Sequence, residues 1–252
     1  MQRYMISHSL EKFPEAPIQL VGEHYHHMKN VMRFKPKTKV FLTDATGYSC
    51  IAEITSLTNE YVELHWVKEE TINRELPVHV TIACGLSKGD KLDLVVQKST
   101  ELGVNKVIPF KSKYSVVKWD EGKVKKKQQR FQKIASEAAE QSHRQSVPVI
   151  EEMKNIEQLI NYSQTYAHKL VAYEEEAKTG ELGRFVQTLQ KMKPGEDLLI
   201  VFGPEGGLDP SEMELFQDHG FISCGLGPRI MRAETAPLYT LAAISYHYEL
   251  LN

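Results

Sequence analysis

Two stretches, VFGPEGG at residues 201–207 and LGPRIMRAETA at residues 226–236, decide the fold that we predict for this chain. The first ends an apolar run that is typical of a buried strand. Its glycines let the backbone take positive φ angles and approach a ligand closely. Pro204 fixes one φ angle and removes a backbone donor. This stretch therefore predicts a strand that breaks into a tight, ligand-facing turn.

The second stretch follows another short apolar segment, residues 221–224, and runs into a helix expected to begin near Thr235 or Ala236. Pro237 then falls in the first helical turn, where proline is tolerated. Two strand-end loops about one strand–helix unit apart emerge at the same carboxyl edge of a parallel sheet, where open α/β folds bind ligands. We therefore predict that both stretches build one ligand site.

Composition and charge are those of an ordinary globular protein. Of 252 residues, 41% are hydrophobic and 25% charged, which allows one large domain or two small ones. No apolar run approaches the roughly 20 residues of a membrane helix, and we expect no signal peptide. Cys50, Cys84 and Cys224 are scattered, which favours reduced thiols in the cytoplasm over disulfides or a zinc site. The formal net charge of −2 means that any contact with nucleic acid must be local.

Residues 1–72 favour a small antiparallel β-barrel. Alternating side chains with β-branched and aromatic members predict its strands. These strands are expected at residues 40–43, 49–54 and 61–66. Residues 24–33 are consistent with a short helix between strands. Residues 69–77 are polar and aperiodic and end in proline, so we place the boundary there and expect domains at 1–72 and 73–252.

From residue 78 onward, strand and helix patterns alternate, which predicts an α/β architecture with a mostly parallel sheet. Its strands are expected at residues 78–83, 104–110, 170–173, 198–202 and 221–224. Asp90 is a candidate cap for the first helix, and Gly103 is expected to end it. Tyr173 ends a strand one unit before the GPEGG strand and leads into an acidic loop, Glu174–Glu176. We therefore expect Tyr173 beside the same site.

The segment from residue 111 to residue 133 is the most basic of the chain. Its cations are Lys111, Lys113, Lys118, Lys123, Lys125, Lys126, Lys127, Arg130 and Lys133. Such a run is usually a solvated charged face, and a footprint for ribose-phosphate is the alternative. Tyr114 and Trp119 lie among these lysines, where they could stack on bases. The sequence leaves both interpretations open.

Taken together, GPEGG and LGPRIMRAETA resemble the signature of the SPOUT superfamily of knotted methyltransferases, and more narrowly its RsmE family of ribosomal RNA uridine-N3 methyltransferases. The resemblance covers most of the chain. It includes HHMKNVMR at 26–33, KGDK at 88–91, TELGV at 100–104 and EAAEQS at 137–142. It implies a PUA-like, RNA-binding β-barrel at residues 1–72 and a SPOUT domain at residues 73–252 with a C-terminal trefoil knot. Because knots are rare, the knot rests on the resemblance alone.

The same resemblance implies an activity. It is methylation of N3 of a specific uridine in 16S ribosomal RNA, in the small ribosomal subunit, by a cytoplasmic homodimer that uses S-adenosylmethionine and no metal. The helix after residue 235 could supply the dimer contact or could simply be core. Its apolar residues are Leu238, Leu241, Ala242 and Ile244.

Other functions were weighed against this activity. One is a SPOUT enzyme that modifies another RNA position, such as a ribose 2′-hydroxyl. Another is a non-catalytic protein that binds RNA through the barrel and the basic helix. A nicotinamide-dependent oxidoreductase is disfavoured, because GPEGG is not the GxGxxG fingerprint.

The two loops offer backbone groups for the edge of adenine and apolar walls for its faces. Their likeness to the family's cofactor loops gives a set of residues predicted to bind S-adenosylmethionine. The set is Tyr173, Phe202, Gly203, Pro204, Glu205, Gly206, Gly207, Leu226, Gly227, Ile230, Met231, Arg232, Thr235 and Ala236.

Catalysis at uridine N3 requires removal of a proton, so the site needs a base or a cation that stabilises the uridinate oxygens. Arg232 is the candidate cation, and Glu205 and Glu234 are the candidate bases. Two structural alternatives stay open. Glu234 could stabilise the N-terminus of the following helix together with Thr235, and Arg232 could form an ion pair with one of the glutamates.

A further set is predicted to contact RNA: His26, His27, Arg33, Lys88, Lys113 and Arg144. A solvated helix or a cap on the barrel is the alternative for the histidines, and a satisfied helix end is the alternative for Arg144. Metal binding by His26 and His27 is disfavoured, because adjacent helical residues diverge by about 100°. Lys113, Tyr114 and His143 depart from the family pattern, which leaves the geometry of RNA contact open.

Overall fold

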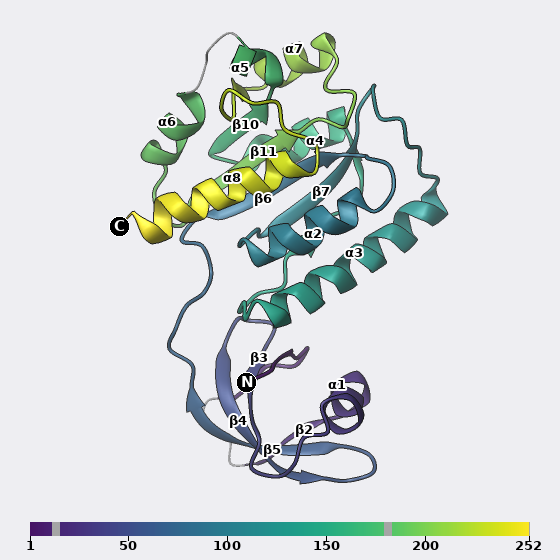
Figure 1. The fold of residues 1–252 in the computed structure, drawn as a ribbon, viewed down its shortest axis with the longest axis vertical. Helices are drawn as coiled ribbons and strands as arrows, with labels where there is room; N and C mark the ends of the chain where they lie inside the picture. Colours follow the sequence, from purple (N-terminus) through teal and green to yellow (C-terminus); the bar gives the residue numbers. More distant parts are fainter. Residues whose placement is uncertain (12–15, 179–182, 252) are drawn as a thin grey trace. The chain divides into compact units, whose positions relative to one another are not determined.

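A computed structural model of the chain describes residues 1–11, 16–178 and 183–251, which form two compact units (Figure 1). The first unit comprises Met1–Glu75 and Ala139–Val147, and the second comprises Leu76–Ala138 and Pro148–Asn252. Each unit contains its own β-sheet. The first unit is discontinuous in sequence, because a short later segment of the chain belongs to it.

The first unit is built on a five-stranded sheet in the order β1-β3-β4-β5-β2. Its elements are β1 (Arg3–Met5), β2 (Ile18–Leu20), α1 (Gly22–His26), the π-helix η1 (His27–Val31), β3 (Lys39–Thr43), β4 (Ser49–Leu57) and β5 (Val62–Glu69). Strands β3, β4 and β5 form an antiparallel meander, and β1 pairs in parallel with β3. Alternate residues such as Val40, Leu42 and Ile54 have no exposed surface, as the period-2 pattern predicts.

Two features of this sheet differ from the sequence-based expectation. The strands β1 and β2 were not predicted, because three residues are too few to show a period-2 pattern. They form the two edges of the sheet, and no pairing between them is recorded among the described residues. The second feature is the parallel pairing of β1 with β3, in a unit that was expected to be antiparallel.

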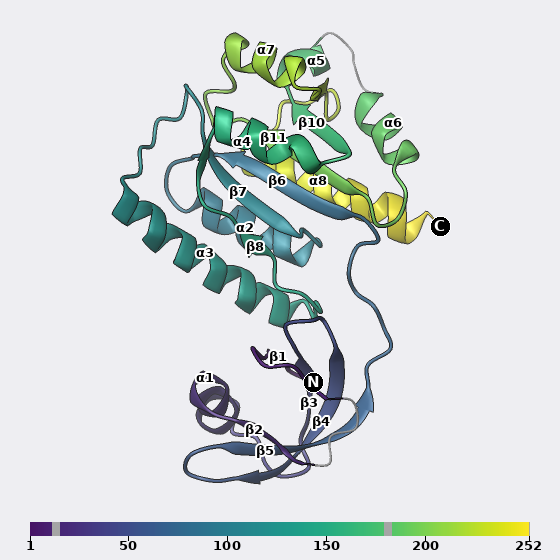
Figure 2. The ribbon, with the colours of Figure 1, turned by 180° about the vertical axis from the view of Figure 1, so that it is seen from behind.

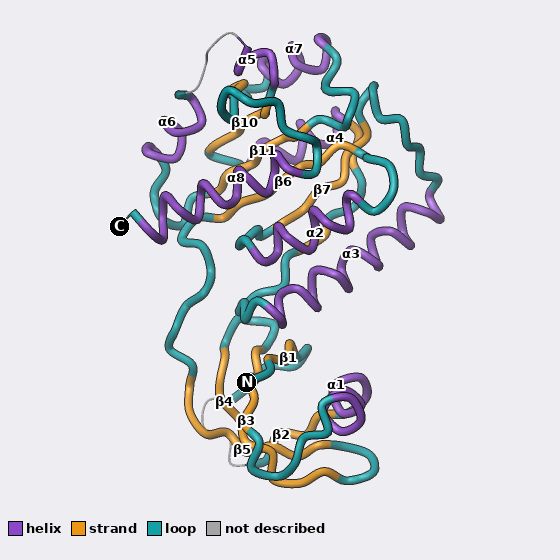
Figure 3. Tube along the Cα trace, in the orientation of Figure 1, coloured by secondary structure: helices purple, strands orange, loops and turns teal. Residues whose placement is uncertain are grey.

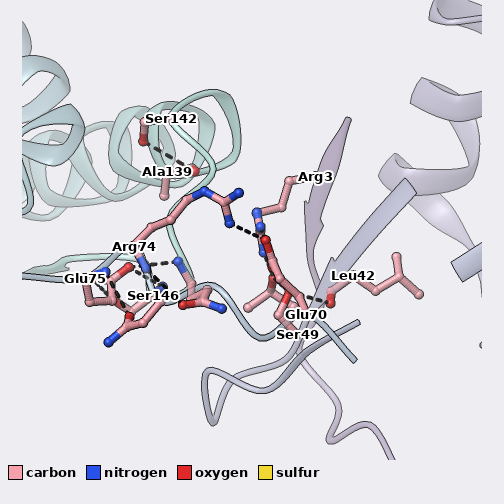
Figure 4. A network of polar contacts seen from close by, with 12 residues as sticks. Arg3, Leu42, Ser49, Glu70, Arg74, Glu75, Ala139, Ser142 and Ser146 are labelled. Atoms are coloured by element: carbon pink, nitrogen blue, oxygen red, sulfur yellow. Dashed lines mark hydrogen bonds and ion pairs between the residues drawn. The ribbon is translucent and has the colours of Figure 1, made fainter. Parts of the chain in front are cut away.

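A buried ion-pair network ties β1 to its neighbours (Figure 4). The Arg3 side chain is fully buried, and its guanidinium donates to Glu70 at 2.6 Å and to Ser49 at 2.8 Å. Ser49 Oγ donates to the same carboxylate at 2.6 Å, and Arg74 donates to its other oxygen. Burial opposes ionisation of Glu70, but the hydrogen bonds from Ser49 and Arg3 outweigh it, so the pKa of Glu70 is lowered.

The second unit is built on a parallel sheet whose main path is β12-β10-β11-β6-β7-β8, with β9 paired to β7. Its strands are β6 (His79–Gly85), β7 (Lys106–Lys111), β8 (Val149–Ile150), β9 (Lys154–Asn155), β10 (His168–Ala172), β11 (Asp197–Phe202) and β12 (Ile222–Cys224). Every recorded pairing between them is parallel. The predicted α/β architecture is thereby confirmed, and the trefoil knot stays a prediction.

Helices cover both faces of this sheet. They are α2 (Lys91–Glu101), α3 (Glu121–Gln141), α4 (Ile156–Tyr162), the 3-10 turn η2 (Ser163–Thr165), α5 (Glu174–Lys178), α6 (Arg184–Lys191), α7 (Pro210–Asp218), α8 (Thr235–Ser245) and the π-helix η3 (Tyr246–Leu250). Figure 1 shows α2 and α8 in front of the sheet, and Figure 2, from behind, shows α4 in front. A core cluster under α4 and α7 joins Leu159, Val201 and Phe216.

Local signals in the sequence account for most helix ends of this unit. Gly103 takes a φ of +93° just after α2, as expected for a glycine that ends a helix. Asp90 precedes α2, but its side chain accepts no capping hydrogen bond, contrary to expectation. The acidic loop expected at Glu174–Glu176 is instead the first turn of α5, where carboxylates are favourable. Helix α7 has a capping box between Asp209 and Glu212, a signal that the sequence analysis missed.

None of the helices in the described ranges is both long enough and apolar enough to cross a membrane.

We predict that Glu70→Gln destabilises the first unit by about 3 kcal/mol at pH 7, because it leaves the buried Arg3 charge without its counterion. The folded-state pKa of Glu70 lies below its unfolded value, so the ion pair stabilises the unit above about pH 4.3 and loses that effect as the pH falls further. Unfolding in urea at pH 7 and pH 4, followed through Trp66 fluorescence in a Trp119→Phe background, measures both effects.

Glu53→Gln is the matched control, since Glu53 forms an exposed ion pair with Lys39 at 3.9 Å. Such pairs contribute at most about 1 kcal/mol. Equal destabilisation by the two substitutions would contradict the role assigned to Glu70.

Candidate functional site

Three parallel strands of the second unit end side by side. Strand β10 lies between β11 and β12, and its last residue, Ala172, pairs with Phe202 and with Cys224. The backbone N–H of Tyr173 then donates to the carbonyl oxygen of Cys224 at 3.1 Å. Because the strands are parallel, the segments that follow them leave the same carboxyl edge, which is where such sheets bind ligands.

These segments enclose a pocket of about 540 Å³. That volume lies within the roughly 300–1,000 Å³ range of small-molecule sites. The lining residues come from the ends of β10 and β11, from the loops after β11 and β12, and from the starts of α2, α5 and α8: Lys91, Ala172, Tyr173, Glu174, Glu175, Phe202, Gly203, Pro204, Glu205, Gly206, Gly207, Leu208, Leu226, Gly227, Pro228, Arg229, Ile230, Met231, Arg232, Ala233, Glu234 and Ala236. Figure 3 draws the long loop that precedes α8 in teal.

The backbone at and beside the turn after β11 packs so closely that a Cβ atom added at Gly203 or Gly85 would press against a neighbouring backbone atom. Gly207 takes a φ of +75°, and its N–H donates to the Pro204 carbonyl at 2.9 Å. A Cβ on Gly203 would lie 3.1 Å from the Gly207 carbonyl carbon. A Cβ on Gly85, at the end of the neighbouring β6, would lie 2.4 Å from the Pro204 nitrogen. The glycines therefore let the backbone itself form the wall of the pocket.

The loop after β12 forms the opposite wall and runs into α8. Gly227 takes a φ of +107°, a conformation that side-chain-bearing residues rarely adopt. The carbonyl of Arg232 accepts hydrogen bonds from Thr235 at 2.9 Å and Ala236 at 3.1 Å, which fixes the start of the helix. Ile230 is 68% exposed at this wall. An exposed apolar side chain on a pocket rim is suited to cover a flat, uncharged ligand face.

Lys91, the first residue of α2, links both loops through their carboxylates. Its Nζ lies 2.9 Å from Glu205 Oε1 and 3.4 Å from Glu234 Oε2. The hydrogen bond to Glu205 raises the pKa of Lys91. Burial opposes ionisation of Glu205, but the hydrogen bonds from Lys91 and from the backbone N–H groups of Glu205 and Lys88, with the charge of Lys91, together outweigh it, so the pKa of Glu205 is lowered. Glu205 is thus held as a carboxylate with a counterion.

Glu234 differs from Glu205. Its Oε2 is buried and accepts no hydrogen bond among the described atoms, although Lys91 lies within ion-pair distance. Glu234 also stands at the N-cap of α8, yet its side chain makes no capping hydrogen bond. A capping hydrogen bond is therefore absent, although the carboxylate stands at the helix N-terminus, where a negative charge is favourable.

Arg232 has an exposed side chain that lines the pocket. The structural alternative for this residue was an ion pair with Glu205 or Glu234. Lys91 occupies that role, and no ion pair of Arg232 is recorded in the part of the chain that the structure describes. Its guanidinium is consequently available to a ligand.

The pocket brings together all but one of the residues predicted to bind the cofactor. Thr235 is the exception, since it does not line the pocket and its N–H closes the turn to Arg232. The sequence analysis missed Lys91, Arg229 and the acidic residues that follow β10. Lys91 lies in the KGDK motif, so a signal was present, but only the sheet order brings α2 beside both loops.

The residues predicted to contact RNA fall into both units. In the second unit, Lys88 is exposed and its backbone N–H donates to Glu205 at 3.3 Å. Lys113 is 57% exposed, and its ammonium lies 3.1 Å from Asp209 at the start of α7. In the first unit, His26 and Arg33 are exposed.

Two predicted RNA contacts in the first unit already have protein partners. His27 Nδ1 lies 2.9 Å from the hydroxyl of Tyr4. Arg144 is 2% exposed, its Nε donates to Glu75 at 3.2 Å, and a second nitrogen donates to Ser146 at 3.3 Å. For Arg144, these contacts favour the satisfied helix end over RNA contact.

Comparisons with known proteins agree with this architecture. The profile of an RNA methyltransferase domain matches residues 74–245, and that of an RNA methyltransferase PUA domain matches residues 20–65. The ribosomal RNA small subunit methyltransferase E of Bacillus subtilis is 46% identical, over 100% of this chain and 99% of its own length.

Solved structures extend the agreement to three dimensions. A crystal structure described only as a hypothetical protein has a TM-score of 0.93 at 43% identity, with all of both chains covered. A ribosomal RNA small subunit methyltransferase E from Neisseria gonorrhoeae, solved with S-adenosyl methionine bound, has a TM-score of 0.86 at 28% identity, again over all of both chains. The resemblance noted in the sequence is confirmed: the chain belongs to the ribosomal RNA small subunit methyltransferase E family.

Proposed function

We propose that this protein is a methyltransferase that uses S-adenosylmethionine to methylate N3 of a uridine in 16S ribosomal RNA of the small ribosomal subunit. Family membership supports the reaction class. The observation that carries the proposal is the pocket at the joint carboxyl edge of β10, β11 and β12, one wall of which is the glycine-rich backbone turn after β11.

The pocket fits S-adenosylmethionine by its shape and by its chemistry. The backbone of Gly203–Gly207 and of the loop around Gly227 offers donors and acceptors to the edge of an adenine. Leu226, Ile230 and Met231 offer apolar contact to its faces. When bound, the cofactor supplies an electrophilic methyl group on a sulfonium. The chain's own part is to hold the donor and the acceptor within reach of one another.

The acceptor nitrogen must lose a proton, and Arg232 and Glu234 are the residues that we assign to this step. The exposed Arg232 guanidinium stabilises the negative charge that develops on the uracil oxygens. Glu234 accepts the proton, directly or through a water, because Lys91 lies farther from its carboxylate, at 3.4 Å, than from that of Glu205, at 2.9 Å. Glu205 is the weaker candidate base, because Lys91 lowers its pKa and neutralises its charge.

The remaining expectations belong to the same proposal. Residues 1–72 serve as an RNA-binding module, with His26, His27 and Arg33 as its contacts, and residues 73–252 carry the chemistry. The enzyme works in the cytoplasm, where its ribosomal substrate would be. It acts as a homodimer through the exposed side of α8 and η3, because Leu241 and Ile244 are buried in the chain's own core and Tyr239 and Tyr246 are exposed.

We expect Gly85→Ala to weaken binding of S-adenosylmethionine by about tenfold or more, because the new methyl would displace the GPEGG turn at Pro204. Isothermal calorimetry measures the dissociation constant. Gly122→Ala is the control, since its Cβ would meet no heavy atom closer than 3.5 Å. Unchanged affinity in a folded Gly85→Ala protein would disprove the importance of this close approach.

The proposed function is tested by methylation of small ribosomal subunits in vitro, with mass-spectrometric mapping of the modified base. Arg232→Ala should lower kcat by about 100- to 1,000-fold, and Arg232→Lys should recover part of it. Calorimetry with the cofactor separates binding from chemistry. A loss explained entirely by weaker cofactor binding would remove Arg232 from catalysis, and a methylated ribose would reject uridine N3 as the target.

Tyr246→Glu should convert the dimer to a monomer, because it places a charge in the proposed apolar contact, where Tyr246 is 55% exposed. Light scattering coupled to gel filtration reports the mass. Val116→Glu is a control at a similarly exposed residue outside α8 and η3, with 61% exposure. A wild-type protein that is monomeric at micromolar concentration would refute the dimer.

A further inference from the structure

A second pocket of about 240 Å³ lies in the second unit and is not part of the site described above. It is formed by the turn from β6 to α2, the segment between β7 and α3, and one side of α3. Its lining residues are Ser87, Lys88, Gly89, Leu92, Val117, Trp119, Lys123, Lys127 and Phe131. We call it the Trp119 pocket.

The walls of the Trp119 pocket are apolar and aromatic. The rings of Trp119 and Phe131 have centroids 6.1 Å apart and planes inclined by 47°, so they diverge and do not stack on each other. Phe131 is buried, whereas Trp119 is partly exposed. Leu92 and Val117 complete the apolar lining. A flat aromatic ligand could lie against Trp119 without displacing a protein ring.

Cations surround this apolar interior. Lys127 lies 5.4 Å from the centroid of the Phe131 ring and 3.7 Å from Asp93, so it has a partial counterion. No ion pair is recorded, among the described residues, for the ammonium groups of Lys88 and Lys123. Residues 111–133 contain nine basic residues and only two acidic ones, although the whole chain has a net charge of −2. The local field therefore attracts an anion to this pocket.

The Trp119 pocket adjoins the cofactor pocket through one turn of backbone. Lys88 lines the Trp119 pocket, and its backbone N–H donates at 3.3 Å to Glu205, which lines the cofactor pocket. Lys91, three residues later, contacts the same carboxylate at 2.9 Å. A polymer that reaches one pocket can therefore reach the other through neighbouring units.

We infer that the Trp119 pocket binds one unpaired base of the RNA substrate, close in sequence to the nucleotide that is methylated. This inference rests on the proposed function. A volume of about 240 Å³ is below the usual range for a complete small-molecule ligand and suits one flat ring. The base stacks on Trp119, and Lys88 and Lys123 hold the adjoining phosphates. Because the Ser87 hydroxyl and the Trp119 indole N–H are the only neutral polar side-chain groups among the described lining residues, the pocket accepts different bases.

Fluorescence tests base stacking directly. The chain has two tryptophans, Trp66 and Trp119, so Trp66→Phe leaves Trp119 as the only tryptophan reporter. A short oligouridylate should quench its emission, and an abasic ribose-phosphate oligomer of equal length should quench it far less. Equal quenching by both oligomers, or by neither, would overturn the inference, because no base would then be entering the pocket.

Substitutions of Trp119 test the contribution of the Trp119 pocket to catalysis. Trp119→Ala should weaken binding of small ribosomal subunits by roughly 10- to 100-fold, seen as a higher KM with little change in kcat. Trp119→Phe should recover most of the affinity, because it keeps an aromatic face. Circular dichroism and the dissociation constant for S-adenosylmethionine verify that the variants are folded. A folded Trp119→Ala protein with an unchanged KM would refute the pocket's role.

Lys123→Ala and Lys125→Ala form a matched pair of charge removals on α3. Two residues turn a helix by about 200°, so Lys125 points away from the side of α3 that lines the pocket. Lys123→Ala should reduce the salt dependence of RNA binding, as the slope of log K against log salt, by about 0.7, and Lys125→Ala should change it much less. Equal changes in the two slopes would indicate that the lysines attract RNA only through their general positive charge. That result would contradict the proposed role of the pocket.

Different methylation results would show that this inference is wrong or that the proposed function is wrong. If the proposed function is wrong, the wild-type protein itself does not methylate uridine N3 in small ribosomal subunits. If only the pocket assignment is wrong, the wild-type protein methylates them, and Trp119→Ala does so with the same KM.

Discussion

The parallel register of β11, β10 and β12 is the constraint on which the rest of the second unit depends. Backbone hydrogen bonds align Phe202, Ala172 and Cys224 across the sheet, so three chain segments leave it at one level. The segments that follow these strands therefore start close together, because the sheet fixes where each strand ends. Gly85, at the end of the neighbouring strand β6, packs closely against Pro204, so β6 also helps to fix the position of the turn after β11.

Charge in the cofactor pocket is organised by a lysine and not by the arginine that the motif suggested. Lys91 lies between Glu205 and Glu234, 2.9 Å from the first and 3.4 Å from the second, and offers both carboxylates a counterion. Lys91 is the recorded ion-pair partner of both glutamates and Arg232 has none among the described residues, so the Arg232 guanidinium is available to a ligand. The two carboxylates are also made unequal. Glu205 receives the shorter contact, and Glu234 keeps a buried oxygen that accepts no hydrogen bond in the described structure.

In the first unit, ion pairs serve to hold a short edge strand and a distant chain segment in place. Its edge strand β1 has only three residues, too few for a large apolar contribution. The buried guanidinium of Arg3 instead connects β1 to Ser49 on β4 and to Glu70 just after β5. A second pair, Arg144 with Glu75, ties the segment Ala139–Val147 to residues near the end of the first segment. Buried charges of this kind stabilise a fold only while each keeps its partner.

The sequence by itself determined the class of the fold, the family and most of the lining of the pocket at the ends of β10, β11 and β12. Strand periodicity, glycine turns and a proline in the first turn of α8 are local signals, and local signals can be read from neighbouring residues. Of the residues that the motifs at residues 201–207 and 226–236 predicted for the site, all but Thr235 line the pocket. Short elements such as β1, β2 and β8 escaped detection, because two or three residues show no period.

Only the tertiary structure decided which distant residues act together. The sequence left open an ion pair of Arg232 with one of the glutamates, and in the structure Lys91, more than a hundred residues away from both carboxylates, is their partner. It also buried Arg144 against Glu75, and it brought Lys88 and Leu92 to Trp119 and Phe131 in one pocket. The physical reason is that ion pairing and burial depend on distances in space, which the order of strands in the sheet sets and a linear pattern does not contain.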